Sequence, residues 1–278
     1  MIKCSVVIPA KSREELLQRA IDSVINSTHS EIAEIIIIDD HSSPPLSPSN
    51  LREQDRLIRL NRPSGAAIAR NRGIAAARGD VIYLLDSDDY FIEKNFLIEH
   101  KQATETNCIY YSEITSQGYT SCFPYEVSIE KFFELIFFKT PHICQTSSLY
   151  FSKSVEVRFD ESLPKHQDWD FVYSALIKNI KVIKGLGTVY FDRSDQSSIS
   201  RKQISSRSTP WFNKLRSAPE TISEAKLLEI RYHIFSQHPD SYSWKSFITH
   251  TAQLLYSQKT NLKCTLRKLL RRIINVAQ

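Results

Sequence analysis

Short apolar runs alternate with helical patterns over the first third of the chain. Runs that predict buried strands occupy residues 4–8, 35–38, 57–60 and 81–85. Residues 13–27 place Leu16, Leu17, Ala20, Ile21, Val24 and Ile25 on one face of a helix. An alanine-rich helix opens at Ser64-Gly65 and ends at Gly79. This alternation of strands and helices predicts an α/β fold with a mostly parallel, doubly wound sheet.

Three carboxylates follow the 81–85 run within four positions, at Asp86, Asp88 and Asp89. Their mutual repulsion costs free energy unless a cation or a set of donors compensates, and Mg²⁺ or Mn²⁺ takes such oxygens well. The alternative is that Asp86 caps a following helix, with the other two in its first turn. Pro9 and the pair Asp39-Asp40 also end strands, and ligands of doubly wound sheets bind at the carboxyl ends of the strands. The shared position favours a site for a charged ligand.

The composition is that of a globular protein, with 278 residues, 41% hydrophobic and 24% charged. No apolar stretch approaches the roughly 20 residues of a membrane span. The N-terminal apolar run ends at Pro9 and is typical of a strand, not a signal peptide. Five cysteines without a CxxC pair indicate reduced thiols in a cytoplasmic protein. With a net charge of only +5, we expect no nucleic-acid partner.

Four blocks in order carry a resemblance to a known family: Val6–Pro9, Ile37–Ser43, Gly65–Ile74 and Gly79–Asp89. They resemble the family 2 glycosyltransferases, which are enzymes of GT-A fold that take a sugar from a nucleotide diphosphate. The resemblance implies that Asp40, with Asp39 beside it, holds the uracil or ribose and that Arg70 lies near the nucleotide. It also implies that Asp86 and Asp88, around Ser87, fill the DxD role on the sugar-ribose and the metal.

The first loop departs from the family pattern. Pro9, Ala10 and Lys11 would line the nucleotide site, but relatives usually have an aromatic residue and an Asn where this chain has Lys11 and Ser12. Lys11 leans on the base through its stem, meets a phosphate, or is a solvated loop lysine.

The segments Phe159–Leu163 and His166–Phe171 resemble the part of the family that bears the catalytic base, which implies that role for Asp168. Gln167 replaces the usual Glu, and the loss of a like charge should lower the pKa of Asp168. The alternative is an ordinary helix N-terminus, which we prefer for Asp170. Asp195 stands where relatives have a His near the metal, and is either a metal ligand or part of a plain polar loop.

The C-terminal end predicts a basic amphipathic helix. Leu262, Leu266, Leu269, Leu270 and Ile273 form one face, with lysines and arginines around it. Residues 262–278 would contact an anionic membrane surface, or alternatively pack on the domain with a solvated basic face.

These observations predict an inverting glycosyltransferase that uses a UDP-sugar donor with Mn²⁺ or Mg²⁺ and forms a β-linkage. The acceptor would be a lipid-linked glycan or an oligosaccharide in bacterial O-antigen, capsule or lipopolysaccharide core synthesis. The protein would be cytoplasmic, and peripheral on the inner membrane through its tail. A sugar nucleotidyltransferase and a non-catalytic sugar-nucleotide or polysaccharide-binding module remain as alternatives.

We expect a GT-A domain at 1–205, with a nucleotide-binding half (1–105) and an acceptor-binding half (106–205), then a helical extension at 206–278. Tyr110, Tyr111 and Phe123 are expected to be exposed on the acceptor side.

Overall fold

The computed structural model describes residues 2–92, 107–116, 119–120, 124–136, 145–191 and 207–217. The chain divides into two compact units, residues 1–199 and 200–278. In the second unit the described part consists of α5 (Thr209–Arg216), which carries the buried Trp211, and its flanking residues. The domain boundaries predicted from the sequence stay a prediction.

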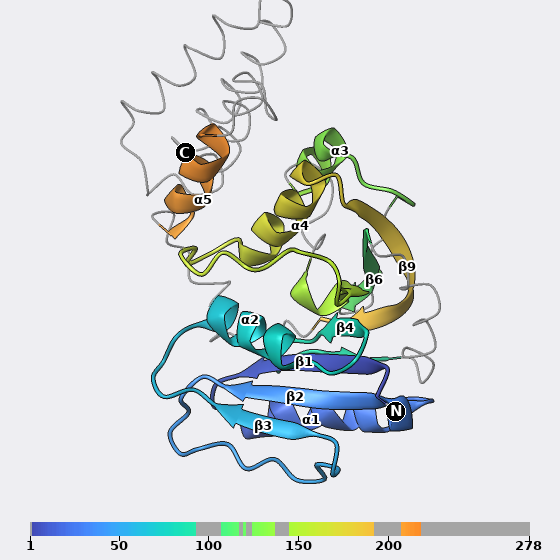
Figure 1. Ribbon diagram of the computed structural model, residues 1–278, viewed down its shortest axis with the longest axis vertical. Coiled ribbons are helices and arrows are strands. Elements are labelled where there is room, and N and C mark those ends of the chain that lie inside the picture. Colours follow the sequence, from blue (N-terminus) through green and yellow to red (C-terminus); the bar gives the residue numbers. More distant parts are fainter. Residues whose placement is uncertain are drawn as a thin grey trace, which may run out of the picture. The chain divides into compact units, whose positions relative to one another are not determined.

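The first unit is an α/β structure built on one sheet (Figure 1). Its first elements are β1 (Cys4–Ala10), α1 (Glu14–Ile25), the 3₁₀ turn η1 (Ser30–Ile32), β2 (Ala33–Asp39), β3 (Arg56–Arg59), α2 (Ala66–Ala76), β4 (Val81–Leu84) and β5 (Tyr90–Phe91). They are followed by β6 (Cys108–Ser116), β7 (Tyr119–Thr120), α3 (Ile129–Glu134), the 3₁₀ turn η4 (Thr146–Ser148), β8 (Leu149–Ser152), α4 (Gln167–Ile177) and β9 (Lys181–Tyr190).

The sheet is parallel in its first part and mixed beyond it. The strand order is β3-β2-β1-β4-β8-β6-β9-β5, and β7 pairs with β6. The strands from β3 to β4 are all parallel, as the sequence predicts. β8 runs antiparallel to both β4 and β6, β9 runs parallel to β6, and β5 is antiparallel to β9.

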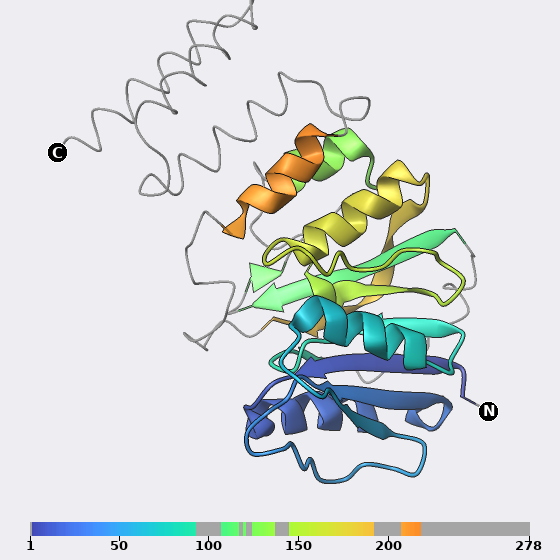
Figure 2. The same cartoon turned by 60° about the vertical axis from the view of Figure 1, so that its left-hand side comes forward.

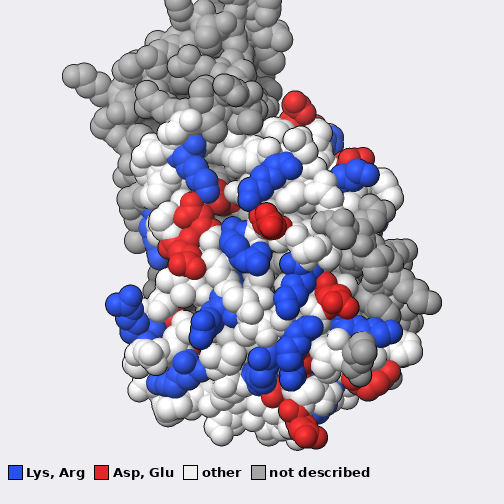
Figure 3. All heavy atoms as spheres, in the orientation of Figure 1, with Lys and Arg blue, Asp and Glu red and all other residues white. Residues whose placement is uncertain are grey.

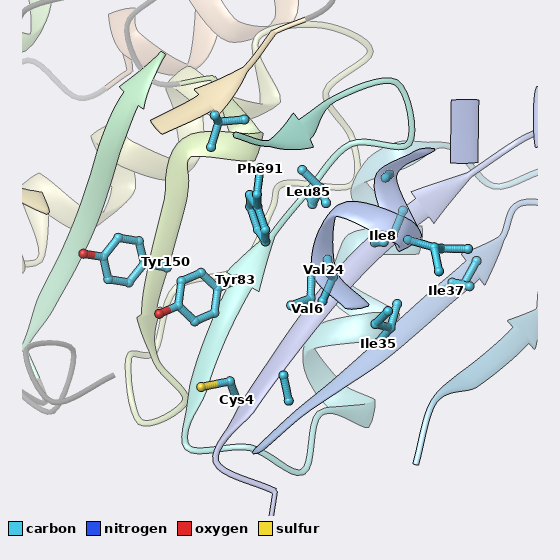
Figure 4. Close-up of a cluster of buried hydrophobic side chains, with 14 of the residues drawn as sticks. Cys4, Val6, Ile8, Val24, Ile35, Ile37, Tyr83, Leu85, Phe91 and Tyr150 are labelled. Atoms are coloured by element: carbon cyan, nitrogen blue, oxygen red, sulfur yellow. The ribbon is translucent and has the colours of Figure 1, made fainter. Parts of the chain in front are cut away.

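The two long helices of the first half cover opposite faces of the sheet. Leu17, Ile21 and Val24 of α1 pack into a core cluster with Val6 and Ile8 of β1, part of which Figure 4 shows. Val7 points to the other face, since side chains alternate along a strand. There α2 comes so close that a Cβ on Gly73 would lie 2.3 Å from Val7 Cγ1. Figures 1 and 2 show how α1 and α2 flank β1 and β2.

Aromatic side chains form much of the core in the second half. The rings of Tyr83, Tyr150 and Tyr110 stack in a row across β4, β8 and β6, with centroids 5.0 and 5.1 Å apart. Tyr110 and Tyr111 are each only 3% exposed, so the prediction that they are exposed is wrong. A tyrosine can bury its ring in a sheet core as readily as it lines a groove. Phe123 lies outside the described residues.

Arginine-to-carboxylate pairs tie the segment from residue 52 to residue 78 to the rest of the sheet. This segment contains seven arginines and two acidic residues. Arg56 and Arg78 both donate to the buried Glu34, and Arg59 donates to Asp39. Two carboxylates of β2 thus pair with three of these arginines, and basic and acidic side chains lie interspersed over the face in Figure 3.

The contact between Gly73 and Val7 generates a prediction about stability. In an open helix position Gly73→Ala would stabilise by about 1 kcal/mol through helix propensity. Here the added methyl collides with Val7, so we expect a net loss of about 1–3 kcal/mol in the free energy of unfolding, measured by urea denaturation. In a Val7→Ala background the contact at 2.3 Å is gone and only Val7 Cβ at 3.3 Å remains, so the same substitution should cost much less. An equal cost in both backgrounds would contradict the close packing of α2 on β1.

Candidate active site

The predicted polar residues gather at the carboxyl ends of β1, β2 and β4. Ala10 pairs with Asp39 at the end of the β1–β2 ladder. On the other side of β1, the amide of Leu85 donates to Val7 O at 3.0 Å, just beyond the last pair of β1 with β4. The loops that begin at Lys11, Asp40 and Asp86 therefore leave the sheet side by side.

Asp39 and Asp40 hold the loops around them in place. Asp39 accepts hydrogen bonds from Arg59 Nη1 and, at 2.8 Å, from the amide of Ser42. Burial works to raise the pKa of Asp39, but the hydrogen bonds from Ser42 and Arg59 outweigh it and keep the pKa below its ordinary value. Asp40 accepts from the amides of Ser64 and Gly65, which precede α2, at 2.5 and 3.0 Å. Both carboxylates thus fix the loops around the residues that the resemblance assigns to nucleoside binding.

Lys11 lies at the edge of this region. Its Nζ is 3.6 Å from Asp40 Oδ2, and its side chain is 51% exposed. The exposed ammonium can meet a phosphate or remain solvated, so the alternatives for Lys11 stay open.

The acidic residues after β4 form a tight turn. The amide of Asp89 donates to Asp86 O at 3.0 Å, and the amide of Asp86 donates to Ser147 Oγ at 3.0 Å. Asp88 Oδ2 lies 3.3 Å from Arg13 Nη1, and Arg19 Nη2 donates to Asp88 O at 2.7 Å. The next element is the strand β5, so the alternative that Asp86 caps a following helix is wrong.

Arg70 joins the acidic turn to the start of α4. It is only 7% exposed, and it donates through Nη2 to Asp86 Oδ1 at 2.7 Å and through Nη1 to Gln167 Oε1 at 3.1 Å. Its guanidinium carbon also lies over the ring of Phe159, 5.2 Å from the centroid. The neighbouring Asn71 exchanges two hydrogen bonds of 2.9 Å with the backbone of Phe159. α2 therefore positions the acidic turn and the segment from 159 to 168 together.

Asp168 is half-buried in the first turn of α4, close enough to Arg70 and Asp86 for both to affect its ionisation. Desolvation by the surrounding protein raises the pKa of Asp168 from 3.8 to about 6, although the amide of Trp169 and the charge of Arg70 work to lower it. The predicted lowering of the pKa through Gln167 is thus outweighed by desolvation. Asp170 is fully buried, in keeping with the structural role expected for it.

Two carboxylates of the turn suit a divalent cation. The side chains of Asp86 and Asp88 are 26% and 20% exposed, so solvent reaches both. Within the described ranges no group of three His, Cys, Asp or Glu side chains is arranged to hold a metal. Mg²⁺, however, is commonly bound through one or two carboxylates plus the phosphates of a substrate. The residues present fit that kind of site, and Asp195 lies outside the described residues.

The profile of the family described as "Glycosyl transferase family 2" matches residues 5–159, more than half of the chain. The chain belongs to glycosyl transferase family 2. The match covers β1 to β8 and the acidic turn, whereas α4 with Asp168 lies beyond it.

Several bacterial proteins are similar to this family 2 chain. An uncharacterized glycosyltransferase of Rickettsia felis is 38% identical over 42% of this chain and 20% of its own length. The poly(ribitol-phosphate) beta-N-acetylglucosaminyltransferase TarP of Staphylococcus aureus is 38% identical over 34% of this chain and 31% of its own length. The amylovoran biosynthesis glycosyltransferase AmsB of Erwinia amylovora is 28% identical over 63% of this chain and 64% of its own length. The chain thus spans between a fifth and about two thirds of these relatives.

A solved structure supports the fold. The crystal structure of S. aureus TarS 1-349 in complex with UDP-GlcNAc matches with a TM-score of 0.63 at 15% identity, over 91% of this chain and 81% of that chain. This likeness, with the family match, confirms the predicted α/β fold of GT-A type for the family 2 chain.

The structure brings together most of the predicted residues of the family 2 site, namely Pro9, Ala10, Lys11, Asp39, Asp40, Arg70, Asp86, Ser87, Asp88 and Asp168. Sequence reasoning missed Arg13, Arg19 and Ser147, which contact the acidic turn, and the bond of Gln167 to Arg70. Arg13, Arg19 and Ser147 stand in no motif used above, and the bond of Gln167 to Arg70 joins two motifs that are 97 positions apart.

The segment predicted to contact a membrane lies outside the described residues. Among the described residues, no helix is both long and apolar enough to cross a bilayer. Residues 262–278 lie outside them, so the basic helix predicted there stays a prediction.

The raised pKa of Asp168 predicts a pH-dependent gain in stability for Asp168→Asn. Well below pH 3.8 the carboxyl is protonated in the folded and unfolded states, whereas well above pH 6 it is ionised in both and its burial costs free energy. The variant removes that cost. The unfolding free energy of variant minus wild type should therefore rise by about 2–3 kcal/mol between pH 4 and pH 7.5.

Urea denaturation of both proteins at matched pH values measures this difference, because titrations elsewhere cancel. A difference that does not change with pH would mean that the pKa of Asp168 is ordinary in the folded protein.

Proposed function

We propose that this family 2 chain transfers a sugar from a UDP-sugar to a glycan acceptor with inversion at the anomeric carbon. The observation that carries the proposal is the bridge through Arg70, which joins Asp86 of the acidic turn to Gln167, the residue before Asp168. The buried guanidinium of Arg70 thereby sets the spacing between Asp86, which would bind the donor, and the desolvated Asp168. Transfer needs that arrangement, because donor and acceptor must meet in a fixed geometry.

Asp168 would act as the general base. A pKa of about 6 leaves it largely ionised at neutral pH yet more basic than an ordinary carboxylate, which suits removal of a proton from an acceptor hydroxyl. As that oxygen attacks the anomeric carbon, Asp168 Oδ would take the proton. Attack from the side opposite the leaving diphosphate inverts an α-linked donor to a β-linked product.

Asp88, with Asp86, would hold Mn²⁺ or Mg²⁺ together with the diphosphate. When bound, such a cation stabilises the negative charge of the leaving group. Arg13 and Arg19, which hold the Asp88 turn, would keep its carboxylate directed toward the mouth of the site. Asp40 would shape the nucleoside pocket by fixing the loop that begins α2.

The names of two relatives support a glycan or other polymer as the acceptor, since TarP is named for poly(ribitol-phosphate) and AmsB for amylovoran biosynthesis. Within that class, the acceptor would be a surface polysaccharide or a lipid-linked glycan. A lipid-linked acceptor would also account for a basic segment at 262–278, which would draw the protein to an anionic membrane surface.

The donor site is tested by thermal denaturation with UDP. We expect UDP to raise the midpoint temperature of unfolding only with Mn²⁺ or Mg²⁺. Asp88→Ala should remove most of this shift, because a ligand that no longer binds the folded protein no longer stabilises it. A screen of nucleotide sugars for UDP release, with mass spectrometry of the product, would then identify the donor. Stabilisation that is equal in EDTA would argue against a metal at the acidic turn. Pyrophosphate release from UTP would favour a sugar nucleotidyltransferase.

The role of Asp168 is tested by kinetics. Asp168→Asn should keep UDP affinity within a few-fold and lower turnover by about 10²-fold or more, as expected for a lost general base. In the wild type, kcat/KM should fall tenfold per pH unit below about pH 6, and this limb should be absent from the variant. Near-normal turnover of Asp168→Asn would place the base elsewhere. Donor binding without turnover on any acceptor would favour a non-catalytic binding module.

A further inference from the structure

A buried serine from the second half of the sheet holds the acidic turn at its first residue. Ser147, in η4, is 2% exposed. Its Oγ accepts the amide N–H of Asp86 at 3.0 Å, and its hydroxyl donates to Asp89 Oδ2, which is also buried. One hydroxyl thus bonds to the residues at both ends of the Asp86–Asp89 turn.

The sheet cannot supply this support itself. The backbone ladder of β4 ends when Leu85 donates to Val7 O, and the next amide, that of Asp86, donates to Ser147 instead. Asp86 is then fixed at three points: its amide by Ser147, its carbonyl by the amide of Asp89, and its carboxylate by Arg70. Removing the hydroxyl would release the first of these and leave Asp89 without one of its donors.

We propose that Ser147 is a positioning residue for the donor site, acting through the backbone of Asp86 to set where the carboxylates of Asp86 and Asp88 meet the cation and diphosphate. The inference rests on the proposed function, because it concerns the same site. Hydrogen-bond partners that orient metal-binding carboxylates are typically worth 10- to 100-fold in metal affinity. Ser147 comes from the segment that leads into β8, so the second half of the domain contributes to the donor site without touching the donor.

The neighbouring Ser148 provides a matched control. It lies in the same turn, is 1% exposed, and its hydroxyl donates to Gln145 O at 2.8 Å, away from the acidic turn. Ser147→Ala and Ser148→Ala each remove one buried hydroxyl from one short element. A purely structural role would make the two variants alike in every measurement.

The experiment is calorimetric titration of UDP in the presence of MnCl2 and, separately, of EDTA. We expect Ser147→Ala to weaken UDP binding with Mn²⁺ by about 10- to 100-fold, and Ser148→Ala to stay within about 2-fold of the wild type. Ser147→Thr, which restores the hydroxyl, should recover most of the affinity. With a nucleotide-sugar substrate, the same loss should appear in KM of the donor. Should Ser147→Ala fail to fold, Ser147→Cys, with a weak donor and acceptor of similar size, carries the test with an intermediate loss.

The outcomes separate the inference from the function beneath it. If the wild type and both alanine variants bind UDP with Mn²⁺ equally, Ser147 has no positioning role and the proposed function stands. If both alanine variants lose affinity to the same extent, the effect is structural and the inference is wrong. If the wild type does not bind UDP with Mn²⁺, the proposed donor site fails and the inference fails with it.

Discussion

The buried guanidinium of Arg70 is the interaction on which the rest of the site depends. A cation that is 7% exposed must be compensated, and here Asp86 supplies the charge while Gln167 supplies only a neutral oxygen. The positive charge is therefore left partly available to Asp168, whose ionisation it assists against the cost of burial. A Glu at position 167 would neutralise Arg70 further and remove that assistance. With Gln in place of Glu at position 167, the charge balance around Asp168 favours its ionised form.

Buried carboxylates are also compensated by hydrogen-bond donors in the first half of the sheet. Asp39 and Asp40 each receive two hydrogen bonds from neighbouring residues, which fix the loops after β2 and before α2. At the opposite end of β2, Glu34 accepts from Ser5, Arg56 and Arg78. Asp39 and Asp40, which the sequence predicts to bind a ligand, thus also hold the fold together.

The parts of the fold that could be predicted are those determined by residues close together in the sequence. The parallel strands β1, β2 and β4 are buried on both faces, so each appears as an apolar run. The acidic turn consists of consecutive residues, 86–89, and is equally visible in the sequence. The central strands of the second half contain serines and tyrosines whose burial depends on partners far along the chain, so Tyr110 was misjudged. The bond of Arg70 to Gln167 spans 97 positions, and Ser147 is one serine in a polar stretch. Nothing in a single sequence marks either contact.

The close approach of Gly73 to Val7 has a consequence for how the proposed acceptor specificity could be changed. Because Gly73 packs closely against Val7, α2 has little room to shift relative to β1. Arg70 and Asn71 on this helix therefore hold fixed positions where they bond to Asp86 and Phe159. If the chain acts as proposed, room for a bulkier acceptor has to be made in the segment from Phe159 to His166, which Asn71 anchors through the backbone of Phe159. Libraries aimed at new acceptors belong in that segment, whereas larger side chains at Gly73 of α2 would cost stability.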